Sequence, residues 1–124
     1  MTEEEIQIND KIYVLKSSIK NSSSAKTKKG LKYVLVRTYS AGVFTGYLKS
    51  RKDKESVLIN ARRLWYWNGA SSLSQLAMEG TTKPQNCKFP CEVDEITLTE
   101  TIEVIPMTEQ ARKSIAEVSI WSQK

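Results

Sequence analysis

The chain has 124 residues, of which 40% are hydrophobic and 27% charged, the composition of one soluble globular domain and not of a disordered segment. It has no histidine, which excludes the Ser–His and Cys–His arrangements of nucleophilic catalysis. No apolar run approaches the roughly 18 residues that a membrane helix needs. The first residues are acidic where a secretory signal is basic and then apolar, so we expect a cytoplasmic protein without membrane partners.

Charge is distributed unevenly along the chain. The net charge is −4 over residues 1–10, +12 over residues 11–63 and −3 over residues 64–124. Such an asymmetry predicts a basic surface that faces an anionic partner. That partner could be a nucleic acid, a phosphorylated small molecule or the acidic end of a neighbouring copy.

Residues 1–30 are expected to form an N-terminal extension. Residues 11–17 are rich in β-branched and aromatic side chains, which predicts a short strand. Residues 18–30 are rich in serine and lysine and have little to bury, which predicts a flexible basic loop. Its lysines, among them Lys28 and Lys29, could close over an anion, and the alternative is a solvated linker.

Residues 31–124 are expected to form a single globular domain. Three strands are predicted in its first half, over residues 31–39, 43–50 and 56–60, with residues 61–67 as an extension of the third. In the first strand Val34 and Val36 share one face and Tyr33 and Leu35 the other, which predicts cover on both sides. Gly46 within the second strand indicates a bend or bulge.

The second half of the domain contains the helix signals. Ser71 or Ser72 is a predicted cap for a short helix that ends at Gly80, and Thr108 is a predicted cap for a final helix over residues 109–118. Between the helices, residues 91–105 alternate as one long strand or a hairpin.

The sequence suggests roles for two further side chains, Glu100 and Trp121. Glu100 falls on the apolar side of the 91–105 pattern, so it lies either at a bend or beside a base. Trp121 is expected to pack as a C-terminal anchor. Taken together, the elements predict an α+β, β-rich fold, either a small antiparallel meander or an SH3-like bent barrel with two short helices.

The cysteines do not point to a cofactor. Cys87 and Cys91 fit a reduced structural pair in a cytosolic protein. A zinc site needs about two further soft ligands, which leaves only a site shared between two chains as the alternative. The many carboxylates between Glu92 and Glu103 alternate along a strand and do not converge, and no phosphate-binding glycine loop is present. We therefore expect a non-enzymatic protein without cofactor or metal.

The densest binding chemistry lies at the end of the third predicted strand. Arginine makes bidentate contacts to phosphate, and aromatic rings stack on bases. The alternative is that the tryptophans fill the core. The candidate ligand-binding residues, including the loop lysines and a neighbouring stretch of the first strand, are Arg37, Tyr39, Arg62, Arg63, Trp65, Tyr66, Trp67, Lys28 and Lys29.

Three blocks carry a resemblance to a known group of proteins. They read R-T-Y-S-A-G-V-F-T-G-Y-L, N-A-R-R-L-W-Y-W-N-G-A-S-S-L-S-Q-L-A-M-E-G and L-T-E-T-I-E-V-I-P. With them, residues 32–121 resemble a family of small proteins of unassigned function encoded by bacteriophages and prophages. The resemblance implies a viral origin, action in the host bacterial cytoplasm and no catalytic residues.

Three functions are compatible with these features. The favoured hypothesis is a phage protein that sequesters a nucleotide second messenger of bacterial immunity, with its pocket at a homo-oligomer interface. The second is a nucleic-acid-binding protein that uses the basic and aromatic face. The third is an adaptor or inhibitor of a host enzyme that uses the tryptophans as hot spots.

Overall fold

The domain is built from one antiparallel sheet and two short helices. The computed structural model describes residues 24–122. The elements in chain order are β3 (Tyr33–Thr38), β4 (Val43–Lys52), β5 (Glu55–Arg63), α2 (Leu73–Glu79), the 3₁₀ turn η1 (Pro84–Asn86), β6 (Val93–Leu98), β7 (Thr101–Pro106) and α3 (Glu109–Glu117). The strand order across the sheet is β6-β5-β4-β3-β7, with every pair antiparallel. This confirms the predicted α+β, β-rich fold.

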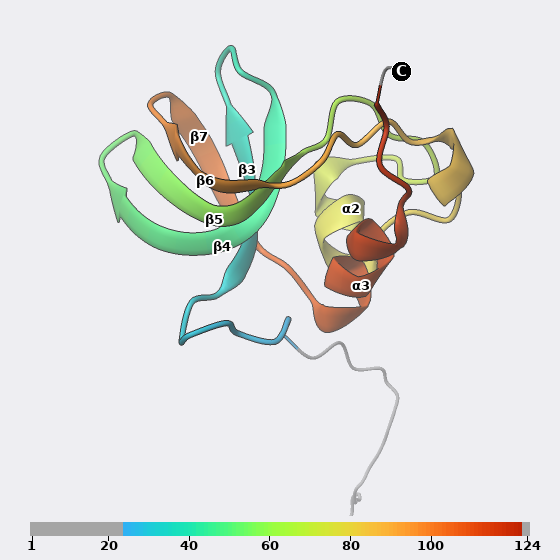
Figure 1. The fold of residues 1–124 in the computed structure, drawn as a ribbon, viewed down its shortest axis with the longest axis horizontal. Helices are drawn as coiled ribbons and strands as arrows, with labels where there is room; N and C mark the ends of the chain where they lie inside the picture. The colour runs from blue at the N-terminus through green and yellow to red at the C-terminus, as the bar shows by residue number, and fades with distance from the viewer. Residues whose placement is uncertain (1–23, 123–124) are drawn as a thin grey trace, which may run out of the picture.

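The sheet curls because its two outer strands are joined directly. β6 and β7 lie at opposite ends of the strand order, yet only residues 99–100 connect them. The turn is tied to the β4–β5 hairpin, since the Thr101 amide donates to the Lys54 carbonyl at 2.9 Å. Buried Ser56 and Thr101 hydroxyls also lie 2.8 Å apart. The meander is therefore bent into an open barrel, with both helices packed to one side of it (Figure 1).

Each face of β3 contributes to a separate core. Val34 and Val36 lie inside the curled sheet with Phe44 and other apolar side chains. Tyr33 and Leu35 lie on the opposite face, against the helices. The prediction that this strand is covered on both sides is confirmed, and the predicted irregularity at Gly46 appears as a register shift between Thr45 and Tyr47.

Both helices begin at the predicted capping residues. The Ser72 hydroxyl accepts from the Gln75 amide at 3.1 Å, and the Thr108 hydroxyl accepts from the Ala111 amide at 3.1 Å. The Gly80 amide closes α2 by donating to the carbonyl of Leu76 at 3.0 Å. These caps satisfy backbone groups that a helix end otherwise leaves without partners.

Other expectations are refined by the structure. Residues 91–105 form a hairpin, β6 and β7, with Glu100 at its turn and accepting a hydrogen bond from Ser40. β5 ends at Arg63, so the strand does not extend to Trp67. Trp121 packs with its ring parallel to that of Trp65, but 45% of its surface is exposed. The predicted strand over residues 11–17 lies outside the described residues.

Candidate functional site

Most of the predicted ligand-binding residues occupy three separate parts of the surface, and one of the others, Arg62, is buried. Lys28 and Lys29 line a pocket beside β4 and β5. Trp65 and Tyr66 lie beyond the end of β5, whereas Arg37 and Tyr39 lie at the end of β3. Arg62 is only 5% exposed. The candidate residues therefore do not form one continuous face.

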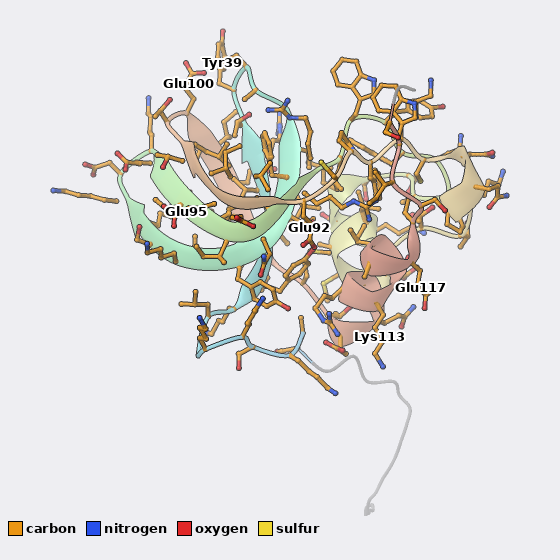
Figure 2. All side chains as sticks on the ribbon, in the orientation of Figure 1. Tyr39, Glu92, Glu95, Glu100, Lys113 and Glu117 are labelled. Atoms are coloured by element: carbon orange, nitrogen blue, oxygen red, sulfur yellow. The ribbon has the colours of Figure 1, made fainter. Side chains whose placement is uncertain are left out.

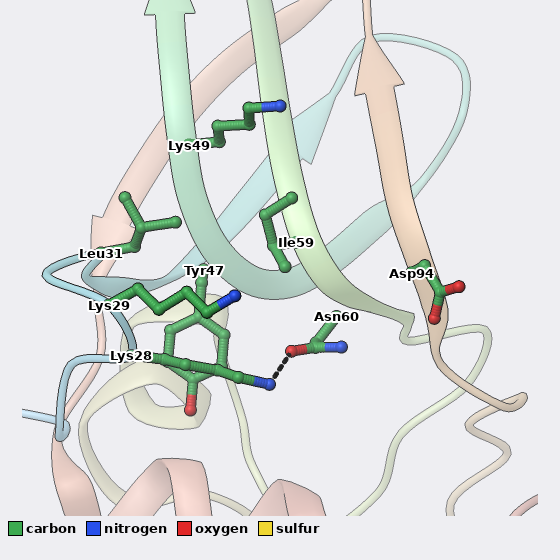
Figure 3. A pocket seen from close by; sticks show the side chains of 8 residues that line it. All are labelled: Lys28, Lys29, Leu31, Tyr47, Lys49, Ile59, Asn60 and Asp94. Atoms are coloured by element: carbon green, nitrogen blue, oxygen red, sulfur yellow. Dashed lines mark hydrogen bonds between the residues drawn. The ribbon is translucent and has the colours of Figure 1, made fainter.

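The pocket beside β4 and β5 has a basic rim and a largely apolar floor. Its volume is about 410 Å³, within the ~300–1,000 Å³ range of small-molecule sites. We call it the lysine pocket. Its lining residues are Lys28, Lys29, Leu31, Tyr47, Lys49, Ile59, Asn60 and Asp94 (Figure 3).

A tight turn places the two loop lysines at this pocket. Lys28 and Leu31 exchange backbone hydrogen bonds of 3.1 and 2.9 Å. The residues between them, Lys29 and Gly30, have φ values of 52° and 79°. Positive φ at both central positions defines a type I′ turn, which needs glycine or another residue tolerant of the left-handed region.

The segment that precedes this turn is fastened to the domain. Ala25 is buried, and its amide donates to the Met107 carbonyl at 2.9 Å. The Lys26 amide donates to the carboxylate of Glu109 at 2.7 Å. Within the described residues, the lysines of the turn are therefore positioned by contacts with the C-terminal part of the domain.

The floor of the lysine pocket is shaped by a β-bulge. Tyr47 is paired with Ile59, but Thr45 is paired with Arg62, so Asn60 and Ala61 together oppose a single residue of β4. Asn60 has a φ of 51°. Bulges reorient side chains, and non-glycine residues with positive φ are concentrated at functional sites.

The charge at the pocket is incompletely balanced. The Lys28 ammonium donates to the amide oxygen of Asn60 at 2.6 Å, and a neutral amide does not cancel its charge (Figure 3). The same ammonium lies 5.9 Å from the centre of the Tyr47 ring. Lys49 is 3.2 Å from the carboxylate of Glu95, an exposed pair that is weak in water. The arrangement favours an anion with a flat or apolar part.

Arg62 is a structural residue rather than part of an exposed surface. Its guanidinium lies under the C-terminal segment and 5.5 Å from the centre of the Phe89 ring. Burial lowers the pKa of Arg62, although arginine stays protonated in proteins. Its four hydrogen bonds, of 2.8 to 3.2 Å, go to the backbone carbonyls of Phe89, Pro90, Ile115 and Val118.

The other aromatic candidates divide between surface and core. The rings of Trp65 and Trp121 are nearly parallel, with an angle of 4° and centroids 6.4 Å apart. Trp67, by contrast, is half-buried against the core between the sheet and the helices. Arg63 is exposed, and its guanidinium carbon lies 4.7 Å from the centre of the Phe44 ring.

Arg37 and Tyr39 lie near the hairpin turns of the barrel. Arg37 is 3.5 Å from Glu103, and both side chains are about half exposed. Tyr39 is 79% exposed and projects beside Glu100 at the turn (Figure 2). Neither residue lines the lysine pocket.

Several residues that the structure adds to these surfaces were not predicted. In the lysine pocket they are Tyr47, Lys49 and Asn60, and beside Trp65 they are Lys88 and Trp121. Asn60 had a usable signal, because asparagine is disfavoured in strands and tolerated at bulges. The sequence contained no signal for Lys88 or Trp121, since Lys88 reaches Tyr66, and Trp121 reaches Trp65, only through tertiary structure.

The described residues contain no cluster for a metal ion. Cys87 is buried and Cys91 exposed, and both are free thiols. The Cys87 sulfur lies 3.6 Å from the carbonyl oxygens of Asn68 and Lys83. Among residues 24–122, no three His, Cys, Asp or Glu side chains are grouped so that they could hold a metal. Neither helix described here has the length and apolar character needed to cross a bilayer.

Most of the described domain matches the model of one protein family. The model described as Domain of unknown function (DUF6948) matches residues 31–115. The chain belongs to this family. No curated protein and no solved structure matches the chain. The DUF6948 match begins at Leu31, so the floor of the lysine pocket lies inside it, whereas Lys28 and Lys29 directly precede it.

Proposed function

We propose that the protein binds a nucleotide-like anion in the lysine pocket and does not transform it. The observation that carries this proposal is the set of three lysines, Lys28, Lys29 and Lys49, around an apolar floor with a single carboxylate, Asp94. Lysines supply the point charges that phosphates need, and an aromatic side chain supplies a surface for a base.

The specific form of the proposal is sequestration of a nucleotide second messenger of bacterial immunity by a phage-encoded protein. It rests on the resemblance of residues 32–121 to phage proteins and on the absence of histidine from the sequence. A protein that only sequesters its ligand needs a pocket and sufficient copies, not an acid–base pair. A homo-oligomer that covers the open side of the pocket belongs to the same proposal.

Calorimetric titration with cyclic di-AMP, cyclic di-GMP and AMP tests the proposal. We expect saturable binding of at least one of them, and a loss of at least about tenfold in affinity in the double variant Lys28→Ala/Lys29→Ala, equivalent to ~1.4 kcal/mol. The matched control is Lys52→Ala/Lys54→Ala, which removes two exposed lysines outside the pocket and should bind normally.

Native mass spectrometry of the same samples separates binding from catalysis. Ligand released by denaturation should have the mass of the ligand that was added. A changed mass would contradict a non-enzymatic role. Equal affinity in the pocket variant and the control, or no binding of any of the three probes, would contradict the lysine pocket as the site.

A further inference from the structure

A second surface with binding chemistry lies beyond the end of β5. It consists of Trp65, Tyr66, Lys88 and Trp121, and we call it the tryptophan platform. The pocket beside it shares no lining residue with the lysine pocket. Any function of the platform is therefore independent of the one proposed above.

Backbone pairing fixes the platform in place. Tyr66 and Lys88 form an antiparallel bridge with hydrogen bonds of 3.2 and 2.7 Å. Phe89 and Ile120 form a parallel bridge, and the Trp121 amide donates to the Phe89 carbonyl at 2.9 Å. Three short segments, far apart in the sequence, thus lie side by side and present their side chains together.

Arg62 supports this arrangement from below. Its guanidinium holds the carbonyl oxygens of Phe89 and Pro90 on one segment, and those of Ile115 and Val118 at the end of α3. The segments that carry Lys88 and Trp121 are therefore joined through a buried side chain. Preorganised surfaces lose less conformational entropy when a ligand binds.

The rings on the platform remain open to a ligand. Trp65 is 63% exposed and Trp121 is 45% exposed, although their rings lie parallel to each other. The Lys88 ammonium lies 5.9 Å from the centre of the Tyr66 ring and 5.7 Å from a Trp121 ring. Flat π surfaces and a cation are thus presented within one small area.

The pocket beside the platform adds neutral hydrogen-bonding groups. It has a volume of about 490 Å³, and Tyr66, Lys88 and Trp121 line it. Asn68, Gln85 and Asn86 line the rest with Cys87, and no Asp or Glu is among the lining residues that the structure describes. Amides donate and accept hydrogen bonds at once, which suits the edges of nucleobases.

We propose that the tryptophan platform binds the unpaired bases of a single-stranded nucleic acid. Exposed indole rings stack on bases of any sequence, and the Lys88 ammonium contacts the neighbouring phosphate. A duplex hides its base faces inside the stack, so it cannot use the rings in this way. A protein partner would use exposed tryptophans equally well, but it gives no reason for a pocket of amides beside a lysine, with no Asp or Glu among its described lining residues.

Fluorescence titration with twelve-nucleotide oligo(dT) and oligo(rU) at about 50 mM salt tests the proposal. Binding should quench the emission of Trp65 and Trp121. Trp65→Ala and Trp121→Ala should each weaken binding roughly 5- to 150-fold, the effect of losing about 1–3 kcal/mol of stacking. Lys88→Met should reduce the slope of log K against log salt by about 0.7. A duplex of the same length and thymidine monophosphate should bind more weakly than oligo(dT).

Two control variants locate the site. Tyr39→Ala removes an aromatic side chain that is even more exposed but lies elsewhere, and it should leave binding unchanged. Lys28→Ala/Lys29→Ala should also leave it unchanged. Trp65→Phe keeps a stacking ring and should recover most of the affinity, which separates stacking from folding.

Four results would overturn the proposal. They are no quenching by either oligonucleotide, equal affinity of the Trp65→Ala and wild-type proteins, equal loss in Tyr39→Ala, and loss only in the lysine-pocket variant. The last result would assign nucleic acid to the lysine pocket. Failure of the platform would leave the nucleotide titrations of the lysine pocket unaffected, so the two proposals can fail separately.

Discussion

Arg62 donates from Nη1 to the carbonyl oxygen of Ile115 at 2.8 Å, which ties the end of β5 to the last turn of α3. The final carbonyls of a helix have no partners within the helix, and the helix dipole places partial negative charge there. A guanidinium is suited to this position because its donors point in several directions. The sheet, α3 and the C-terminal segment are thus joined at one side chain.

Arg62→Met should destabilise the protein by about 3 kcal/mol or more, because it removes the Arg62 donor from the carbonyls of Pro90 and Val118, whereas those of Phe89 and Ile115 keep a backbone donor. The neighbouring Arg63→Met should cost about 1 kcal/mol or less, since Arg63 is exposed and contributes mainly its contact with the Phe44 ring. Urea denaturation of both variants measures the difference. Equal destabilisation would contradict the structural role assigned to Arg62.

Substitutions at Asn60 separate backbone strain from side-chain function. Glycine accepts a φ of 51° without penalty, so Asn60→Gly should stay within about 0.5 kcal/mol of wild type. Asn60→Ala should cost about 1–2 kcal/mol because of the left-handed backbone. Both variants remove the acceptor of Lys28, and both should change ligand affinity equally in the calorimetric titration. If ligand affinity instead falls only in the less stable variant, the role of Asn60 is purely structural.

Gly80 and Gly30 have almost the same φ, 80° and 79°, but different surroundings. A Cβ at Gly80 would collide with Ser114 of α3, whereas one at Gly30 would have no atom within 4 Å. Both alanine variants place a Cβ on a residue with positive φ, which destabilises the backbone. Only Gly80→Ala must also push α2 and α3 apart. We expect Gly80→Ala to have the lower melting temperature by several degrees. Equal melting temperatures would contradict the close approach of the helices.

Tyr33 should make stability sensitive to alkaline pH. Burial raises its pKa to about 12, while its hydroxyl lies 2.8 Å from that of Thr45. The folded state holds this proton more tightly than the unfolded state, so its contribution is complete below about pH 10 and is lost as the pH rises towards 12. Ultraviolet titration should show one of the five tyrosines ionising last, and Tyr33→Phe should abolish that step.

Glu109 should make stability sensitive to acid. Hydrogen bonds from Arg112, at 2.5 and 2.9 Å, and from the Lys26 amide lower the pKa of Glu109 to about 2. The contribution of this carboxylate is present above about pH 4.5 and is lost as the pH falls towards 2. Glu109→Gln should therefore lose less stability than wild type between these values, as measured by thermal melts.

Two further variants test the partners of Glu109. Arg112→Met removes the main cause of the lowered pKa and should flatten the acid dependence in the same way. Lys113→Met, at an exposed neighbour in α3, should change it much less. An unchanged pH profile in Glu109→Gln would contradict the ion pair.

Much of the fold could be predicted because its signals are local. Ser72, Thr108 and Gly80 mark helix ends through hydrogen bonds and backbone angles that depend on a few neighbours. The alternation in β3 predicted that both faces are covered. The curl of the sheet could not be predicted from local signals, because it depends on β7 returning to pair with β3 after a tight turn.

The site was harder to predict because burial is a tertiary property. Strand alternation placed Arg62 and Arg63 on opposite faces. It did not indicate which of the two is covered by the C-terminal segment. The partner of Trp65 is Trp121, far along the chain, and no local pattern relates the two. The shape of the lysine turn depends on Ala25 and Lys26 docking against residues beyond position 106.

The lysine pocket straddles the edge of the family domain, with its basic rim on residues 28 and 29 and its floor on β4 and β5. Lys28 and Lys29 thus bring two of the three pocket lysines from outside the matched residues, while β4 and β5 supply the floor and Lys49. Replacing these two side chains would change the charge of the rim and leave the floor in place. Under the proposed function, substitutions at residues 28 and 29 would therefore alter ligand choice without replacing the buried Ala25 that fastens the segment.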